Sequence, residues 1–432
     1  MSTKAKYSPA QPIRLLVLFI LVISGTVICG FGNRKKTKEP QEYLLVVSFD
    51  AFRADYHTHY NTPNLNRLAT DGVKAGRMYS SFPTNTFPNH YTIATGLYPD
   101  HHGLINNSFY APDLDRPYGL VNIMVYNQEI GRHYRIDRSS VEDAAFYGGE
   151  PMWVTAEKHG LKSAAFFWVG SEAPVGGIYP SYWKQYNPKI PFAARIDTVV
   201  KWLGYPDHMR PRLVNLYFEE PDATSHAYGP ISNATGALVE KLDSLLGDLR
   251  TKLAALPIAN KINLIVLSDH GMASVSPNRY INLKAVVPER MISGVSGGTP
   301  FLLVSPAAGK ADSILMLINR TTGIRAWKKL ELPARWHYGS HPRIPEIVVL
   351  ADSSWSIGMS DRPSTNRGAH GYDNRNPELH SIFYAAGPSF RKNYRIEEMN
   401  NVDVYNIVCR ILGITPAPND GNMEVAEKIM KR

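Results

Sequence analysis

The sequence predicts an α/β fold in which a mostly parallel central sheet is flanked by helices. Four short and nearly continuous apolar runs are typical of buried strands, namely residues 43–49, 161–168, 213–218 and 263–268. Helical patterns lie between them, one opening at Thr62 and Pro63 and a long amphipathic one over residues 233–256. Such alternation favours helices on both faces of the sheet, with ligands beyond the carboxyl ends of the strands.

The N-terminus has the layout of an export signal. Residues 1–14 carry the cations Lys4, Lys6 and Arg14, and residues 15–30 are almost wholly apolar. We expect residues 1–32 to be a signal peptide or a membrane anchor, with 33–42 as a polar linker. The protein is then exported to the periplasm or the extracellular space, with residues 15–32 as the possible anchor. A buried core helix is the alternative.

Composition limits the remaining classes. The net charge of +9 is mild for 432 residues, and no long basic run is interleaved with aromatic side chains. We therefore expect a small anionic substrate and no specific binding of nucleic acid. Cys409 is the only cysteine after Cys29, which excludes an internal disulfide framework in the folded body. It is expected to be a small buried residue.

The body of the chain is expected to be one catalytic domain over residues 43–425. From residue 272 to about 364 the sequence has many Pro, Gly and Trp residues and short strand patterns at 301–304 and 346–350. We interpret this region as an insertion or cap. The chain returns to the core at residues 368–374 and at a strand over 381–386.

Residues 83–90 place a hydroxyl, that of Thr86, in the first turn of a predicted helix. Pro88 suits that first turn, and Gly96 can end the helix in a left-handed conformation. The free N–H groups and partial positive charge of a helix N-terminus stabilise an alkoxide or a phosphoryl oxygen. An ordinary N-cap threonine is the alternative.

Three carboxylates and three imidazoles follow the predicted strands or lie in Gly-containing loops. They are Asp50, Asp222, His226, Asp269, His270 and His370. Mixed nitrogen and oxygen donors suit zinc better than magnesium. Six ligands are too many for one catalytic zinc and right for two with three ligands each. His101 and His102 are expected to be surface loop residues, and Asp55 a surface or helix-initiating residue.

Two such metals can clamp the attacking and leaving oxygens of a phosphoryl displacement. Thr86 would then be the nucleophile, because a metal and the helix N-terminus both favour its alkoxide. The developing charge on the phosphoryl oxygens needs a hydrogen-bond donor. Asn107 and the backbone N–H of Phe87 are the two candidates.

Seven segments together resemble the nucleotide pyrophosphatase/phosphodiesterases of the alkaline phosphatase superfamily. The resemblance runs in order from about residue 43 to 420. The segments are FDAFRAD (49–55), PTNTFPNHY (83–91), TGLYPD (95–100), GGEPMW (148–153), EEPD (219–222), SDHGM (268–272) and HGYDN (370–374). The resemblance implies an alkaline-phosphatase-like fold and hydrolysis of phosphodiester or pyrophosphate bonds.

It also implies roles for single residues. One of two zinc ions per chain would be held by Asp50, Asp269, His270 and the nucleophile Thr86, and the other by Asp222, His226 and His370. Thr86 would form a covalent phospho-threonine ester, with Asn107 donating to a non-bridging oxygen. Phe87 and Tyr186 would sandwich the base of a nucleotide substrate. The segment from Asp115 to Arg132 is longer than the usual loop of the family.

Other activities remain open. Phosphate monoesterases of the superfamily use a Lys and an Arg near the stretch comparable to residues 168–172, and that stretch carries no cation here. This favours a diester or a pyrophosphate over a monoester. A phospholipid-headgroup or glycerophosphodiester hydrolase is a second alternative, and a zinc-stabilised binding module without catalysis is a third.

Overall fold

An eight-stranded sheet forms the centre of the protein. The computed structural model describes residues 42–119, 124–127, 132–135 and 138–431. The sheet has the order β20 (Tyr394–Asn400), β2 (Val73–Tyr79), β19 (Phe383–Ala386), β10 (Ile262–Leu267), β1 (Tyr43–Phe49), β9 (Leu213–Phe218), β7 (Ser163–Phe166) and β8 (Tyr182–Lys184). Every pair is parallel except the two that β19 makes with β10 and β2. The predicted mostly parallel sheet is confirmed.

The predicted strands occur close to their expected bounds, and β1 is buried along its whole length. Two strands are shorter than predicted: β19 begins at Phe383 and not at Ser381, and β7 begins at Ser163 and not at Leu161. The run 161–168 forms β7 only up to Phe166, because Phe167 has a positive φ of 68° that turns the backbone out of the strand. The strands β2, β8 and β20 were not predicted.

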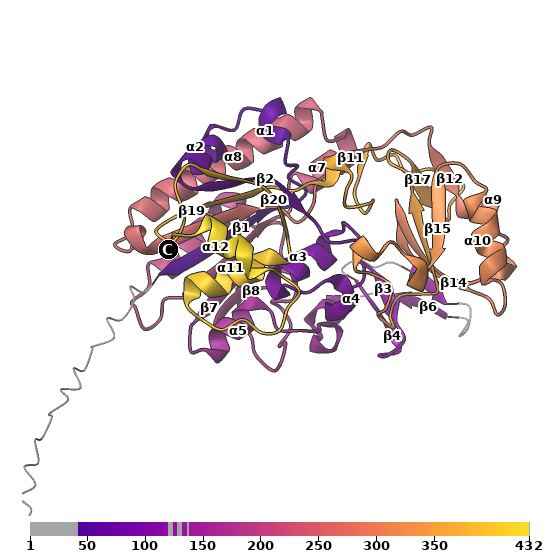
Figure 1. The fold of residues 1–432 in the computed structure, drawn as a ribbon, viewed down its shortest axis with the longest axis horizontal. Coiled ribbons are helices and arrows are strands. Elements are labelled where there is room, and N and C mark those ends of the chain that lie inside the picture. Colours follow the sequence, from indigo (N-terminus) through magenta and orange to yellow (C-terminus); the bar gives the residue numbers. More distant parts are fainter. Residues whose placement is uncertain (1–41, 120–123, 128–131, 136–137, 432) are drawn as a thin grey trace, which may run out of the picture. The chain divides into compact units, whose positions relative to one another are not determined.

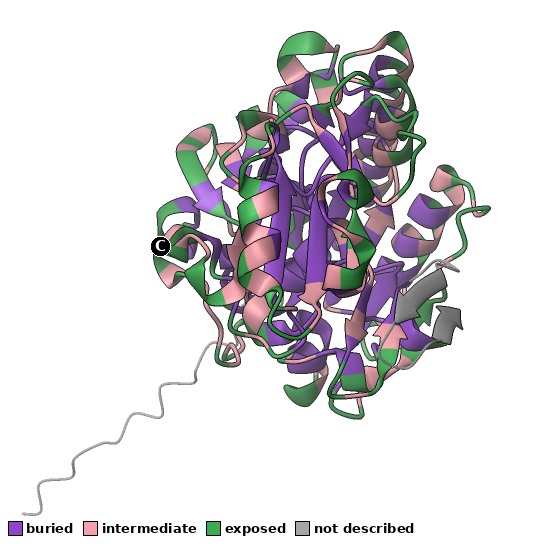
Figure 2. Ribbon diagram, turned by 90° about the vertical axis from the view of Figure 1, so that its right-hand side faces the viewer, coloured by how far each residue is buried: buried purple, intermediate pink, exposed green. Residues whose placement is uncertain are grey.

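Helices cover both faces of the sheet (Figure 1). One face packs against α2 (Pro63–Asp71), α6 (Phe192–Leu203) and α8 (Asn233–Ala254), and the other against α3 (Thr86–Thr95), α5 (Met152–Lys158), α11 (Asp403–Leu412) and α12 (Met423–Ile429). Figure 2 shows the central strands as buried, with exposed residues on the outer sides of the helices. The sheet is therefore the middle layer of three.

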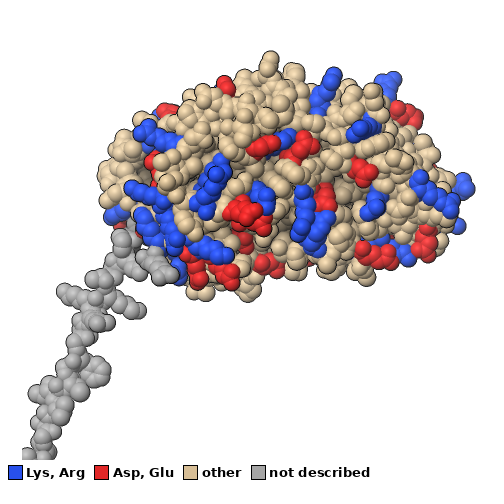
Figure 3. Space-filling view, turned by 45° about the horizontal axis from the view of Figure 1, so that its top comes forward, with Lys and Arg blue, Asp and Glu red and all other residues tan. Residues whose placement is uncertain are grey.

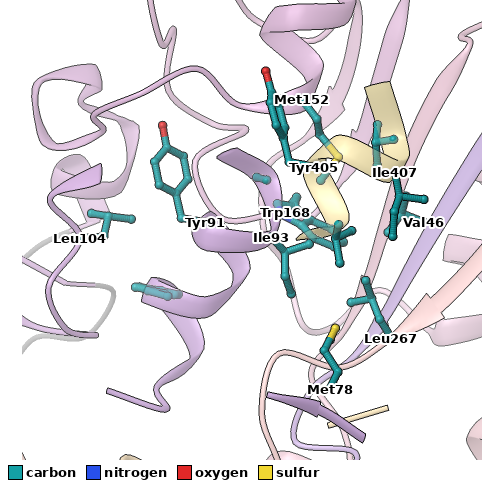
Figure 4. Close-up of a cluster of buried hydrophobic side chains, with 14 of the residues drawn as sticks. Val46, Met78, Tyr91, Ile93, Leu104, Met152, Trp168, Leu267, Tyr405 and Ile407 are labelled. Carbon is teal, nitrogen blue, oxygen red and sulfur yellow. The ribbon is translucent and has the colours of Figure 1, made fainter. Parts of the chain in front are cut away.

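The layer around α3 is a dense apolar cluster. Ile93 of α3 and Ile407 of α11 belong to the same buried cluster as Val46 of β1 and Leu267 of β10 (Figure 4). Burying such an aliphatic side chain contributes roughly 1.5–3 kcal/mol. Cys409 lies in this cluster, buried as predicted. The helix that begins with Thr86 is thus fixed by packing along its length.

A second sheet is built mainly from residues of the predicted cap. Its antiparallel order is β15 (Ile324–Lys328), β16 (Ile347–Ala351), β14 (Phe301–Pro306), β13 (Ile292–Gly298), β5 (Met124–Asn127) and β6 (Arg132–Arg135). Its core includes Ile314 and Ile318 of α10 (Ala311–Asn319). Because β5 and β6 precede residue 272, this sheet is not made by the predicted cap alone. The bounds 272–364 for the cap, and 43–425 for the domain, remain predictions.

The cap sheet and the central sheet belong to one unit, residues 40–432. The segment between β15 and β16 contacts α4. Asp100 of α4 (Pro99–His102) accepts hydrogen bonds from the backbone N–H groups of Ser340, at 2.8 Å, and His341, at 2.9 Å. Among the residues described, no helix is both long and apolar enough to cross a membrane. The predicted export segment, residues 1–32, lies outside the described residues.

Candidate functional site

The carboxyl ends of three adjacent strands bring the predicted ligands to one edge of the sheet. Asp50 directly follows β1, and Asp269 and His270 follow β10 after one residue. Asp222 and His226 lie on α7 (Asp222–Tyr228), shortly after β9. These strands are neighbours in the order β10, β1, β9. His370 comes from the loop after β18 (Gly368–Ala369).

Asp50, Asp269 and His270 form a buried group that could hold a metal ion, with ligand atoms within 4.8 Å of one another. The Nε2 atom of His270 lies 3.6 Å from Oδ1 of Asp50 and 3.1 Å from Oδ2 of Asp269. The hydroxyl of Thr86 lies 3.1 Å from the same Nε2 atom. The residues implied for the first zinc therefore meet around His270.

A second group surrounds Asp222. Its Oδ1 atom lies 3.4 Å from Nε2 of His226 and 3.5 Å from Nε2 of His370. Asp222, His270 and His370 also have ligand atoms within 4.8 Å of one another, and the His270 and His370 rings stack with centroids 3.8 Å apart. His270 thus faces both groups. The assignment of three protein ligands to each ion remains a prediction.

Three carboxylate oxygens at the centre of these groups make no hydrogen bond: Oδ1 of Asp50, Oδ1 of Asp222 and Oδ2 of Asp269. Buried polar atoms without a partner are costly. Burial and the neighbouring carboxylates of Asp269 and Asp222 raise the pKa of Asp50 well above its usual range. A divalent cation would supply the missing partner, and the mixed nitrogen and oxygen donors fit zinc.

The imidazoles are held so that Nε2 faces the carboxylates. Nδ1 of His226 lies 2.8 Å from the carbonyl oxygen of Gly368, and Nδ1 of His370 lies 3.0 Å from that of Thr84. A backbone carbonyl behind a histidine fixes its ring and its tautomer, as is usual at metal sites. Burial, with His270 and His226 nearby, also lowers the pKa of His370, which favours the neutral ring that metals bind.

Thr86 is the first residue of α3, as its sequence context predicts. Asn85 is the N-cap in an extended conformation, and Gly96 ends the helix with a φ of 69°. The side chain of Asn85 makes no capping bond and instead donates to Oδ1 of Asn106 at 2.7 Å. The Asn85 side chain therefore does not cap the first turn of α3 beside the Thr86 hydroxyl.

Asn107 is oriented by the same helix. Its Oδ1 atom accepts a hydrogen bond of 2.8 Å from the backbone N–H of Phe87, and its own N–H donates to Oδ1 of Asn106. The oxygen of the Asn107 amide is therefore engaged, and its nitrogen, Nδ2, is the donor that can face a ligand. The Phe87 N–H is thus the donor that orients Asn107, and its own donation to a phosphoryl oxygen remains a prediction.

A largely aromatic cavity of about 500 Å³ opens from these residues. Asp50, Thr86, Asn107 and Asp222 contribute to its wall, and so do both predicted base-stacking residues, Phe87 and Tyr186. The other lining residues are Ser108, Tyr118, Val141, Tyr147, Phe167, Trp168, Val169, Gly170, Glu172, Pro188, Tyr217, Glu219 and Ala223. Within the described part of the chain, the lining includes no Lys or Arg.

Several wall residues were not predicted. Tyr118 and Tyr147 are buried, and their hydroxyls lie 2.9 Å apart. Tyr118 belongs to the long segment 115–132, so part of this segment lines the cavity. Residues 120–123 and 128–131 of the segment are not described. Tyr217 donates a hydrogen bond of 2.5 Å to Oδ2 of Asp50. The sequence signal for Tyr217 was its place within the apolar run 213–218, because a buried tyrosine hydroxyl needs a hydrogen-bond partner.

Three residues were not expected to be metal ligands, and none of them belongs to the two candidate metal groups. His101 is exposed and pairs with Asp420, as expected for a surface residue. His102 was expected at the surface but is fully buried, with Nε2 3.0 Å from the Thr92 hydroxyl. The α4 turn carries it inward against α3. Asp55 is the N-cap of α1 (Tyr56–His59), in agreement with the helix-initiating role.

Comparison with known proteins agrees with this geometry. The sequence model described as type I phosphodiesterase / nucleotide pyrophosphatase matches residues 44–373. Venom phosphodiesterase 2 of Crotalus adamanteus is 35% identical over 94% of this chain and 49% of its own length. Human ectonucleotide pyrophosphatase/phosphodiesterase family member 1 is 34% identical over 90% of this chain and 42% of its own. The chain spans about half the length of these relatives.

Other matches extend over most of both chains. Bis(5'-adenosyl)-triphosphatase ENPP4 of Pongo abelii is 34% identical over 94% of this chain and 85% of its own length. A solved structure of murine ectonucleotide pyrophosphatase/phosphodiesterase 5, an inactive variant in complex with AMP, has a TM-score of 0.82 and 33% identity. It covers 90% of this chain and 100% of that one. The chain therefore belongs to the type I phosphodiesterase / nucleotide pyrophosphatase family.

Proposed function

We propose that this protein is a two-zinc hydrolase that cleaves phosphodiester or pyrophosphate bonds of nucleotides through a covalent phospho-threonine on Thr86. One observation carries the proposal: the Thr86 hydroxyl lies 3.1 Å from His270, within a cavity that has buried carboxylates at one end and aromatic side chains at the other. Such a cavity can hold a phosphoryl group and a base at once.

Asp50, Asp269 and His270, with Thr86, would hold one zinc ion, and Asp222, His226 and His370 the other. When bound, the ions supply Lewis-acid stabilisation of negative charge on phosphoryl and alkoxide oxygens. The support is the set of three buried carboxylate oxygens that have no hydrogen-bond partner. Both residue groups that could bind a metal are drawn from these ligands.

In the proposed reaction the Thr86 hydroxyl loses its proton to solvent as Oγ bonds to phosphorus. The bond from phosphorus to the leaving oxygen breaks in the same displacement, and the leaving oxygen takes up a proton from solvent. Asn107 donates from Nδ2 to a phosphoryl oxygen, while the N-terminus of α3 stabilises the charge beside it. In a second step water cleaves the Oγ–phosphorus bond and restores the hydroxyl.

Phe87 and Tyr186 would stack on the two faces of the base. Both line the cavity, and AMP is the ligand named for the murine structure that matches this chain. The described lining has no Lys or Arg to neutralise a doubly charged monoester, which supports a diester or pyrophosphate substrate. On the face in Figure 3, acidic side chains lie among the basic ones, which gives no support for a nucleic-acid partner.

Residues 1–32 would export the chain, and residues 15–32 would anchor it to a membrane if they are not removed. The names of the relatives, venom phosphodiesterase and ectonucleotide pyrophosphatase, support an extracellular setting. Fractionation and N-terminal sequencing of the full chain would test this. An intact N-terminus in the soluble cytoplasmic fraction would contradict it.

The function is tested with the purified chain, a zinc analysis and three substrates. We expect about two zinc ions per chain and faster hydrolysis of p-nitrophenyl thymidine monophosphate than of p-nitrophenyl phosphate. A choline phosphodiester tests the phospholipid-headgroup alternative. Faster turnover of the monoester or of the choline diester would overturn the nucleotide assignment, and no turnover of any substrate by zinc-loaded protein would favour a binding module.

A further inference from the structure

The carboxylates of Asp50 and Asp269 share one arrangement. In each, one oxygen accepts a hydrogen bond from a group that is not itself a candidate ligand, while the other oxygen accepts none, although Nδ1 of His90 lies 3.3 Å from Oδ2 of Asp269. For Asp269 the donor is the backbone N–H of Ala51, at 3.2 Å from Oδ1. For Asp50 it is the hydroxyl of Tyr217, at 2.5 Å from Oδ2. The two oxygens that accept no hydrogen bond are those nearest to Nε2 of His270.

The position of Tyr217 follows from the register of the sheet. It lies on β9, paired with Ser48 of β1, two residues before Asp50. The ring is held edge-on against His90, with centroids 5.0 Å apart, and His90 in turn lies with Nε2 2.9 Å from the Ser48 hydroxyl. The phenol is therefore fixed by two strands and α3. Its hydroxyl is thereby aimed at Oδ2 of Asp50.

We propose that Tyr217 is a positioning residue for the metal site, an inference that rests on the proposed zinc-dependent function. By occupying Oδ2 of Asp50, its hydroxyl directs Oδ1 towards Asp269 and His270. Asp50 is then a ligand through one defined oxygen. Groups that orient a ligand in this way affect metal affinity as well as activity.

A different role for Tyr217 must be separated from this one. The residue also lines the cavity, so its hydroxyl could contact the substrate instead. A substrate contact would change KM and leave zinc binding alone, whereas a positioning role acts through Asp50 and changes zinc binding when no substrate is present. Zinc affinity is therefore the readout that distinguishes them.

The test is the substitution Tyr217→Phe, which removes the hydroxyl and keeps the ring. Zinc affinity is measured on the full chain by competition with a chelator, without substrate. We expect the affinity of one zinc equivalent to fall about 10–100-fold, with the other unchanged. Tyr405→Phe is the matched control. Tyr405 lies on α11, and its buried hydroxyl lies 2.6 Å from the hydroxyl of Thr155. This control should bind zinc like the unmodified protein.

A double-mutant cycle with Asp50→Asn completes the experiment. If Tyr217 acts through Asp50, adding Tyr217→Phe to Asp50→Asn should not weaken zinc binding further. Equal zinc affinities for Tyr217→Phe and the unmodified chain would overturn this inference alone, as would additive losses in the cycle. An unmodified chain that binds no zinc would instead overturn the proposed function, so the two failures are distinguishable.

Discussion

The two ends of the cavity are built in different ways. Five of the six candidate ligands lie at the ends of β1 and β10 and on the short helix after β9, so the central sheet sets their spacing, and only His370 comes from the loop after β18. Apart from Phe87 of α3, much of the aromatic end comes from connecting segments that include Tyr118, Tyr147 and Tyr186. The sheet therefore fixes the reacting centre, while the connections can vary and decide which group beyond the phosphate is accepted.

The largest expected effect lies at the reacting end. Thr86→Ala removes the proposed nucleophile, and we expect diester hydrolysis to fall by more than about 10³-fold. Acid-stable labelling of the protein by substrate phosphate should disappear as well. Thr70→Ala is the matched control, because Thr70 is an exposed helical threonine whose hydroxyl donates to the Asn66 carbonyl. Unchanged turnover by Thr86→Ala would exclude it as the nucleophile.

A smaller loss of activity is expected at Asn107, where the metal-ligand end and the aromatic end of the cavity meet. Asn107→Ala removes the donor Nδ2 and should lower kcat by about 10²–10³-fold, because a donor to developing negative charge acts mainly in the transition state. Zinc content should stay the same. Asn422→Ala, which removes the N-cap of α12, is the control and should leave kcat unchanged. A rise in KM with an unaltered kcat would assign Asn107 to ground-state binding only.

The smallest effect on activity is expected from a substitution at the aromatic end of the cavity. Tyr186→Ala should raise KM for a nucleotide diester by about tenfold, since stacking on one base contributes roughly 1–3 kcal/mol. A small diester without a base, such as bis-p-nitrophenyl phosphate, should show a change of less than about threefold. Tyr186→Phe keeps the stacking face and serves as the control. Equal losses on both substrates would show that the two ends are not separable.

The reacting end was the more predictable of the two. Asp50, Asp269 and His270 follow apolar runs that are buried strands, and parallel strands bring such residues to one edge. The wall of the cavity could not be assembled in this way. Tyr118 and Tyr147 lie outside any periodic segment, and their contact depends on packing between distant loops.

The missed strands have physical reasons. β2 interrupts its apolar positions with Lys74, Gly76 and Arg77, and β20 exposes charged residues at the edge of the sheet. Edge strands are commonly charged, because this discourages pairing with another chain. β8 has only three residues and is too short for a period to be recognised. The cap sheet required pairing of β13 with β5, which is a contact over a long sequence separation.

The hydrogen bond from the Phe87 N–H to Asn107 has a mechanical consequence. Thr86 and Phe87 are consecutive residues of α3, so the same helix turn carries the attacking oxygen and the N–H that orients the Asn107 amide. Because α3 is fixed by packing along its length, its first turn holds the Thr86 hydroxyl and the orientation of Asn107 together. A core substitution that displaces this turn would therefore disturb attack on phosphorus and stabilisation of the phosphoryl oxygen at the same time.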